Sequence, residues 1–548
     1  MKSNASLMRL CIFAFLMFLI SGYLHAQYSW NNLPVVKSTS FKKDTFNIKK
    51  FGAKADGITL CSRSINDAIA ACNIKGGGVV IVPKGLWLTG PVEMKSNVNL
   101  HLQKGAMLLF TTDKSQYKLT EGSYEGKPAA RNQSPIWGND LENIAVTGNG
   151  IIDGNGDTWR AVAKRQLTPT QWAEKLKTGG VLNKDSSEWY PSEQFRAAKQ
   201  ENKSMLLSAR KNLSDFEDMK DFLRPNLVVF TNCKRVLLEG NIFQNSGAWC
   251  LHPLLCEDLI IRNVMVKNPE YAQNGDGMDI ESCSNFLIEN CLLDVGDDAI
   301  CIKSGKDEDG RKRGKPTQNG IIRNNTIYKG HGGVVIGSEM SGGARNIFVS
   351  NCSFMGTDKG LRFKSTRGRG GVVENIYARD LVMKDIVDEA IFFDMFYLLK
   401  FATDGERDTR PIVNDGTPIF RNMHFENIVC NGAKKGIFIR GLSEMPVSSI
   451  RISNCTLNTE IGTELVDAAN ITLENIYFNT TSENPVIVAE NVMGLTASKL
   501  TYPSQVKKII KVSGKNSRDI NISKAGANMS NDMIEVEAGA AADAVKMK

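Results

Sequence analysis

A short unit of the form apolar-x-x-Asn-apolar-x-apolar recurs nine times between residues 237 and 478 and limits what this chain can fold into. Copies such as IIRNVMV, LIENCLL and FVSNCSF place β-forming residues on both sides of a turn residue, which is Asn in most of them. Successive turn residues are separated by 23, 27, 34, 27, 29, 47, 27 and 21 residues. A unit of this size cannot bury its apolar face alone, and it is typical of a solenoid whose coils stack. The turn residues are Gly240, Asn263, Asn290, Asn324, Asn351, Asp380, Asn427, Asn454 and Asn475.

The repeat predicts an all-β solenoid of parallel strands over residues 46–515. Asn tolerates a left-handed backbone, and Asn side chains in stacked coils can hydrogen-bond to one another. The longest gaps indicate insertions at residues 306–316 and at about residues 394–416. Near the N-terminus, residues 62–73 place Ile65, Ala68, Ile69 and Cys72 on one face of a helix. We therefore expect a helix that caps the first coil.

The segments outside the repeat have separate signatures. In residues 1–26, Lys2 and Arg9 precede the apolar run LCIFAFLMFLI, which is short for a membrane span and is typical of a cleaved secretory signal. We therefore expect a periplasmic or secreted protein with a lead-in at residues 27–45. Residues 157–224 are rich in Lys, Glu, Gln and Ala and predict a partly helical insertion. Residues 516–548 are expected to form the end of the solenoid and a tail.

Charge and cysteine content narrow the function. The formal net charge is +8, which suits an acidic partner. The chain lacks a basic helix or a basic patch interleaved with aromatic residues, so we expect no nucleic acid partner. Of 12 cysteines, Cys11 lies in the predicted signal, and the others are interpreted as small buried residues in stacked coils. No cysteine pair has zinc-ligand spacing. No metal or cofactor is expected, and we expect a monomer.

Four short motifs fall on consecutive coils. Each alone is common in turns or on solvated strands, but their separations equal one coil plus any insertion. Residues one coil apart lie about 4.8 Å apart, so the four motifs are predicted to form a ladder on one surface. Carboxylates held close together resist simultaneous ionisation, which raises the pKa of one of them. The motifs are Asn274-Gly-Asp276, Gly296-Asp297-Asp298, Gly330-His331-Gly332 and Arg362-Phe-Lys364.

In this order the motifs resemble those of glycoside hydrolase family 28, the polygalacturonases and their relatives. The resemblance covers nearly the whole chain after the signal and implies a right-handed parallel β-helix that hydrolyses galacturonan with inversion. It implies that Asp297 protonates the leaving oxygen, while Asp276 and Asp298 activate water. His331 would tune these acids, and Arg362 and Lys364 would bind a galacturonate carboxylate on the leaving side. Gly275 and Phe363 depart from the usual motif residues without removing a reacting group.

Further segments resemble the exo-acting bacterial members of that family, among them RPNLVVF, NSGAWCLHP, KSGKDEDGRKRG and GSEMSGG. An exo-acting enzyme must block one end of its groove. The candidates for that wall are residues 157–224 and the basic segment 311–313. His252, Arg311 and Tyr397 are further candidate substrate contacts. For His252 and Tyr397 the alternative is packing in the core, and for Arg311 it is a solvated loop.

Three other functions stay open at this point. A rhamnogalacturonan hydrolase or another pectin-type member of the same family would meet rhamnose where Arg362 and Lys364 favour galacturonate. A calcium-dependent pectate lyase on the same fold would need an acidic calcium cage and an Arg base. A non-catalytic carbohydrate-binding β-helix would have no need for the aligned motifs. The expected partner is an acidic polysaccharide such as polygalacturonate, or pectic oligosaccharides.

Overall fold

The computed structural model describes residues 28–397, 410–483, 485–523, 530–537 and 539–548. The chain divides into two compact units, Met1–Val35 and Val36–Lys548, and the second contains the repeats. The predicted signal at residues 1–26 lies outside the described residues. Among the described helices, none is long and apolar enough to cross a bilayer.

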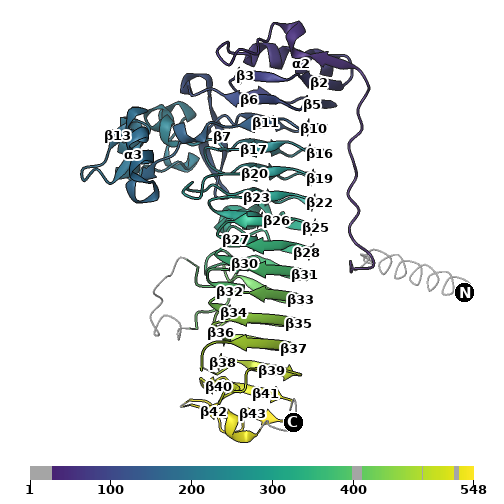
Figure 1. Cartoon of the computed structure of the whole chain (residues 1–548), viewed down its shortest axis with the longest axis vertical. Helices are drawn as coiled ribbons and strands as arrows, with labels where there is room; N and C mark the ends of the chain where they lie inside the picture. Colours follow the sequence, from purple (N-terminus) through teal and green to yellow (C-terminus); the bar gives the residue numbers. More distant parts are fainter. Residues whose placement is uncertain (1–27, 398–409, 484, 524–529, 538) are drawn as a thin grey trace, which may run out of the picture. The chain divides into compact units, whose positions relative to one another are not determined.

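The second unit is a parallel β-helix whose coils stack in chain order, as Figure 1 shows. Its right-handed parallel architecture is the fold predicted from the sequence, with the hand that parallel crossovers adopt. One face is a 14-stranded parallel sheet. Its strands are β4 (Val92–Glu93), β9 (Ile136–Asn139), β15 (Val228–Thr231), β18 (Leu251–Leu254), β21 (Met278–Glu281), β24 (Asp298–Lys303), β27 (Gly332–Ile336), β30 (Lys359–Lys364), β32 (Glu389–Asp394), β34 (Lys435–Arg440), β36 (Ile461–Val466), β38 (Ile487–Glu490), β40 (Ile510–Ser513) and β42 (Ile534–Val536).

The remaining faces form a 24-stranded sheet. Two columns of short strands run side by side until strands of 13 residues span both. The first column holds β1 (Thr45–Asn47), β2 (Gly78–Val82), β5 (Val98–Leu102), β10 (Glu142–Gly148), β16 (Lys234–Glu239), β19 (Glu257–Arg262), β22 (Ser284–Glu289), β25 (Thr317–Arg323) and β28 (Ala344–Ser350). The second holds β3 (Gly85–Thr89), β6 (Ala106–Phe110), β11 (Ile151–Asp153), β17 (Ile242–Gln244), β20 (Met265–Lys267), β23 (Leu292–Asp294), β26 (Thr326–Lys329) and β29 (Ser353–Met355). The spanning and later strands are β31 (Val372–Lys384), β33 (Ile419–Asn431), β35 (Val447–Thr459), β37 (Ala468–Thr480), β39 (Met493–Ser498), β41 (Arg518–Ile522) and β43 (Val545–Met547).

The strand register reproduces the spacing of the sequence repeat. Leu259 pairs with Phe286 and Phe286 with Gly320, which are the predicted offsets of 27 and 34 residues. All nine turn residues have positive φ, from 52° at Asn351 to 80° at Gly240, as a left-handed turn requires. Asn475 donates its amide to Asn454 Oδ1 at 2.7 Å, so stacked turn residues also bond to one another. The prediction from the repeat is confirmed.

The core follows the strand alternation. In β21, Met278 and Ile280 enter the core, while Asp279 and Glu281 lie on the opposite face of the strand. Eleven cysteines are described, and all are free and buried, which confirms the packing interpretation. Helix α2 (Ser62–Ile74) buries Ile65, Ala68, Ile69 and Cys72 and packs on β1 and β2, as the cap at the N-terminal end should.

Residues 157–224 leave the coil stack on one side, as Figure 1 shows. Their small core centres on Phe216 and Met219 and includes Ala130 from a hairpin that the sequence did not predict. The elements are η3 (Gly156–Thr158), β12 (Val162–Ala163), η4 (Lys164–Gln166), α3 (Pro169–Lys177), β13 (Val181–Leu182), β14 (Glu188–Tyr190), α4 (Glu193–Gln200), η5 (Leu207–Ala209) and η6 (Leu213–Phe222). The hairpin is β7 (Leu119–Tyr124) with β8 (Lys127–Asn132), and the other elements are η1 (Ile48–Phe51), η2 (Lys114–Gln116), α5 (Asp307–Arg313) and η7 (Asn531–Met533). Within residues 516–548, β41, β42 and β43 continue both sheets.

Candidate active site

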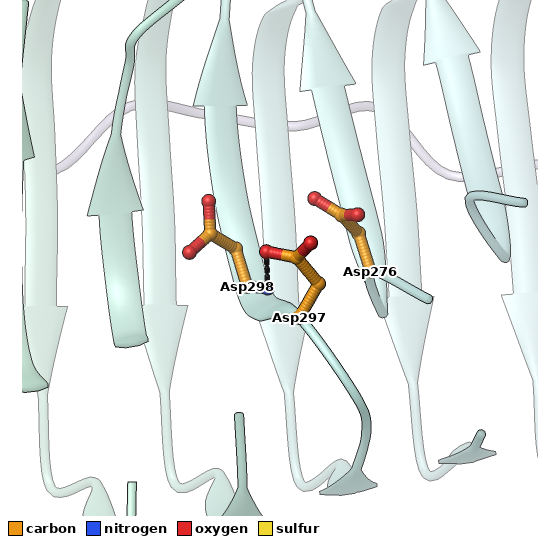
Figure 2. A group of neighbouring side chains, drawn as sticks. All are labelled: Asp276, Asp297 and Asp298. Atoms are coloured by element: carbon orange, nitrogen blue, oxygen red, sulfur yellow. Dashed lines mark hydrogen bonds between the residues drawn. The ribbon is translucent and has the colours of Figure 1, made fainter. Parts of the chain in front are cut away.

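Three aspartates meet on the 14-stranded sheet where two neighbouring strands begin. Asp276 precedes β21, Asp298 opens β24, and the register Met278 with Ile300 sets the two side by side. One oxygen of Asp276, one of Asp297 and one of Asp298 lie within 4.8 Å of one another. Figure 2 shows these three side chains projecting together from the strand ends, with the backbone N–H of Asp298 donating to Asp297 Oδ1 at 3.0 Å. The predicted clustering of the acids is therefore present in the structure.

Glycines permit the tight backbone around the acids. A Cβ on Gly296 would lie 2.4 Å from the carbonyl oxygen of Pro269. Gly330 has φ +143°, and a Cβ there would lie 2.7 Å from the carbonyl oxygen of Asp297. This close approach lets the backbone N–H of His331 donate to the Asp297 carbonyl oxygen at 2.9 Å.

Asp298 is buried and held by two cations from β30. Arg362 Nη1 lies 3.0 Å from its Oδ1, and Lys364 Nζ lies 2.7 Å from its Oδ2. Burial alone would raise the pKa of Asp298, but Lys364 and Arg362 outweigh it and hold this pKa well below its usual range. Asp298 is in register with Gly332, whereas Arg362 is in register with Val335. The two long side chains therefore reach back across a whole coil, and in this structure they pair with Asp298 rather than lying free beside it.

Asp276 has the opposite electrostatic environment. It is 3% exposed, and its Oδ1 has no hydrogen-bond partner among the described residues. Burial, followed by the charges of Asp279 and Asp297, raises its pKa well above the ordinary value. The crowding predicted from the sequence therefore acts most clearly on Asp276, while Asp298 stays ionised. A protonated and an ionised carboxyl group one coil apart are the components of acid–base chemistry.

His331 joins the third acid. Its Nδ1 lies 3.0 Å from Asp297 Oδ1, and its Nε2 lies 3.9 Å from Asp358 Oδ2. The hydrogen bond to Asp297 is the main cause that raises the pKa of His331 above its ordinary value, against the opposing effect of burial. The ring is about half exposed, so substrate and solvent can reach this pair. The hydrogen bond thus favours the protonated form of the His331 imidazole beside Asp297.

The three further candidate contacts divide into one that lies at the site and two that are engaged elsewhere. The Tyr397 ring lies 4.9 Å from Lys364 Nζ and 5.7 Å from the Arg362 guanidinium. His252 is only 2% exposed, with Nε2 2.8 Å from Glu281 Oε2, so it has no free face for a sugar. Arg311 donates to the carbonyl oxygen of Gly368 at 2.6 Å and holds a neighbouring loop. The contacts of His252 and Arg311 favour structural roles over the direct substrate contacts expected from the sequence.

Two groups near the acids had no assigned role in the sequence reading. Arg224 donates to the Gln273 carbonyl oxygen at 2.6 Å and to Asn274 Oδ1 at 2.8 Å, which fixes the loop that leads to Asp276. Lys303 is buried 2.9 Å from Glu339 Oε2 and 3.6 Å from Asp279 Oδ1. Arg224 opens the segment RPNLVVF and Lys303 opens KSGKDEDGRKRG, so both lie in segments that resemble the exo-acting bacterial members.

The three aspartates have the donor atoms that a divalent cation would take. Both oxygens of Asp298, however, are within hydrogen-bond distance of Lys364 and Arg362. A cation here would have to displace or repel two positive charges. The arrangement therefore favours acid–base chemistry over a calcium cage.

Comparison with known proteins gives a consistent set of relatives. A family model described as "Glycosyl hydrolases family 28" matches residues 210–414. The crystal structure of a hyperthermoactive exopolygalacturonase from Thermotoga maritima superposes with a TM-score of 0.66 at 31% identity, covering 82% of this chain and 94% of that one. An exo-poly-alpha-D-galacturonosidase of Dickeya chrysanthemi is 27% identical over 466 residues, which is 81% of this chain and 72% of the relative. A "probable polygalacturonase" of Vitis vinifera is 27% identical over 429 residues, covering 76% and 75% of the two chains.

Proposed function

The chain belongs to glycosyl hydrolase family 28, and from that premise we propose that it cleaves the α-1,4-galacturonosidic bonds of polygalacturonate, with inversion and from the non-reducing end, outside the cytoplasm. The observation that carries the proposal is the triad of Asp276, Asp297 and Asp298 within 4.8 Å, with Asp298 held ionised by Arg362 and Lys364. The family shown by the comparisons is one of hydrolases, and relatives with polygalacturonase names cover most of the chain. The basic net charge of +8 suits a polyanionic substrate.

In the proposed mechanism, Asp297 donates a proton to the glycosidic oxygen as the bond to the leaving sugar breaks. Asp276 and Asp298 hold the attacking water, and Asp298, the ionised one of the two, accepts its proton. His331 shares a proton with Asp297 across 3.0 Å, which keeps the acid supplied. On substrate binding, the carboxylate of the leaving galacturonate binds Arg362 and Lys364, the cations that pair with Asp298 in this structure. Tyr397 borders that position. Arg supplies a bidentate fork and Lys a point charge.

The proposed inversion rests on the resemblance of the motifs to those of the family and not on the carboxyl separation. The nearest oxygens lie within 4.8 Å, whereas inverting pairs are typically about 6.5–9.5 Å apart. Proton NMR of the first product formed tests the proposal directly. The expected product is the β-anomer of galacturonate, and first appearance of the α-anomer would rule out inversion.

The reaction class is tested on polygalacturonate by two assays run side by side. Hydrolysis releases reducing ends without absorbance in the ultraviolet. A lyase releases an unsaturated, absorbing product and loses activity with a chelator. Galacturonate monomer as the product from the first minutes supports exo action, and a ladder of oligomers at that time contradicts it. Cleavage of rhamnogalacturonan in preference to polygalacturonate would overturn the substrate assignment.

The raised pKa of His331 predicts the alkaline limit of activity. The pKa of His331 lies above its ordinary value, so the imidazole keeps the proton that faces Asp297 to a higher pH than a free histidine would. Activity should then fall as pH rises through this raised pKa, because the Asp297–His331 pair loses the proton that the leaving oxygen needs. His331→Gln should reduce kcat about 10–100-fold and move the alkaline limb. A pH profile of kcat that kept the same alkaline limb in the variant would contradict the role of His331.

The lowered pKa of Asp298 predicts the acidic limit of activity. Lys364→Met removes the cation 2.7 Å from Asp298 Oδ2, so the pKa of Asp298 should rise toward its usual range. The carboxylate then becomes protonated at higher pH, and the acidic limb of the kcat profile should move upward. KM for polygalacturonate should also rise. Lys359→Met, which removes a neighbouring cation that pairs with Asp388, is the control and should leave the acidic limb in place.

A further inference from the structure

The β7–β8 hairpin lies on the same outward face of the 14-stranded sheet as the acids, and on the N-terminal side of them. A cavity of about 70 Å³ separates hairpin residues, including Gly122 and Ser123, from outward side chains of the sheet, including Trp137 and Thr231. Those side chains belong to β9 and β15, and β18 contributes His252 and Leu254. Any glycan that followed the sheet from the acids toward the N-terminus would meet the hairpin.

The tip of the hairpin is docked onto the segment that follows β24. Lys306 Nζ lies 2.8 Å from Glu125 Oε2, and Lys127 Nζ lies 2.8 Å from Asp307 Oδ2. Gly126 has φ +77°, and a Cβ there would lie 2.8 Å from the Cα of Gly305. The pairing is reciprocal, because the hairpin contributes one acid and one base and the segment at α5 contributes the complements. This fixes the tip beside the coil that carries Asp298.

A chain of side chains, all buried except the half-buried Arg313, connects the hairpin to the sheet and to α5. Arg131 donates to Asn226 Oδ1 at 3.1 Å, and the amide of Asn226 lies 3.1 Å from His252 Nδ1. His252 Nε2 lies 2.8 Å from Glu281 Oε2, and Arg313 donates to Glu281 Oε1 at 2.6 Å. Because Arg131 fixes the Asn226 amide, His252 accepts at Nδ1 and donates from Nε2. Arg313 also donates to the Gly126 carbonyl oxygen at 3.4 Å, which closes the ring back on the hairpin.

The two central members of this ring are almost fully buried, since His252 is 2% exposed and Glu281 is 0% exposed. Burial alone would raise the pKa of Glu281, but the hydrogen bond from His252 and the charge of Arg313 lower it to about 2. The insertion at residues 157–224 buttresses the base of the hairpin, where Asn132 donates to the carbonyl oxygen of Leu223 at 2.8 Å. The hairpin is thus held at its base, along its length and at its tip.

We propose that this hairpin is the wall that confines the enzyme to chain ends, and that the ring Arg131–Asn226–His252–Glu281–Arg313 positions it. The inference rests on the proposed function. The strand order places Arg362 and Lys364 on the opposite side of the acids from the hairpin. With the leaving sugar at those cations, the hairpin closes the groove on the side of the non-reducing end. His252 and Glu281 are positioning residues, since they act through the wall.

The first test shortens the wall. Replacing Ser123–Pro128 by an Asn-Gly turn keeps Gly122 opposite Ala129 and suits a two-residue hairpin loop. Arg131 loses the Tyr124 ring but keeps its hydrogen bond to Asn226, and Asn132 keeps its bond to Leu223. The wild type should release monomer from polygalacturonate and should not cleave oligomers whose non-reducing end carries an unsaturated residue. The shortened variant should release oligomers and cleave the blocked substrate. Monomer as the sole product of a folded variant would overturn the inference.

The second test exchanges charges at the tip. Glu125→Lys and Lys306→Glu singly should loosen the wall and allow oligomers to appear, and the two together should restore monomer release. The matched control exchanges Glu142 and Arg235, an exposed pair 2.6 Å apart on the 24-stranded sheet, and should leave the product profile unchanged. Equal profiles in the single and double exchange would contradict the docking role.

The third test addresses the ring. Glu281→Gln keeps the side-chain volume but removes the charge that faces His252 and Arg313, so the product profile should shift in the same direction as on shortening. In the shortened background the substitution should add little, because both changes act through the wall. Additive shifts would overturn the positioning role. Failure of the wild type to hydrolyse polygalacturonate would contradict the proposed function itself. An unchanged monomer profile in the folded variants would contradict only the proposed role of the hairpin.

Discussion

Asp297→Asn should reduce hydrolysis of polygalacturonate by about 10²–10⁴-fold while leaving the fold intact. The amide keeps the size of the side chain and can still contact His331, which lies 3.0 Å from Oδ1. It cannot deliver a proton to the leaving oxygen. The loss should appear in kcat, because Arg362 and Lys364 still bind the substrate carboxylate.

The measurement is the initial rate of reducing-end release beside a thermal unfolding curve. The control is Asp294→Asn, a half-buried acid at the end of β23 on the preceding face of the same coil. Its activity should match the wild type. Full activity in Asp297→Asn would remove this residue from the proposed acid role, and equal losses in both variants would point to a general electrostatic effect instead.

A single residue inserted after Leu287 should be as damaging to activity as the loss of Asp297. Strand β22 pairs on one side with β19 and on the other with β25, so a shift of one residue turns Ile288 from the core toward solvent. Each buried apolar side chain displaced in this way costs about 2–5 kcal/mol, a large part of a typical stability of about 5–15 kcal/mol. The same shift moves Asp297 and Asp298 relative to Asp276 on the preceding coil.

Thermal unfolding and activity should be measured together on this insertion variant. The control is one glycine inserted after Gly179, where a Cβ would have no atom within 4 Å. It lies in residues 157–224, away from the coil register, and should leave both properties close to wild type. An active and stable β22 insertion would show that the coil register does not set the spacing of the acids.

Much of the fold was readable because the repeat has a fixed geometry. The offsets 23, 27 and 34 predicted from the turn residues are the offsets at which Val236, Leu259, Phe286 and Gly320 pair. The cap at residues 62–73 and the buried cysteines followed from the same apolar periodicity. A second Asn ladder, with Asn346 donating to Asn319 Oδ1 at 3.0 Å, follows the same offsets but was missed because it lies outside the chosen unit.

The sequence predicted which residues lie at the candidate site better than it predicted what those residues contact. Coil arithmetic brought Asp276, Asp297 and Asp298 together, and the structure does the same. The coil arithmetic did not reveal that Arg362 and Lys364 reach across a coil to pair with Asp298, because the strand register does not set the length and direction of a side chain. His252 was a candidate for either a substrate contact or a packing residue, and the structure buries it between Asn226 and Glu281, which the sequence spacing did not reveal.

The sequence alone determined the parallel solenoid and the coil positions of the four motifs, because a stacked coil converts a fixed sequence offset into a fixed distance. Only the tertiary structure decided where the insertions lie and what they contact. The hairpin at residues 119–132 and helix α5 follow no period, so their pairing through Glu125, Lys127, Lys306 and Asp307 is set by complementary charge and shape in three dimensions. The positions of the candidate site residues could therefore be predicted from the repeat, whereas the hairpin proposed as a wall could not.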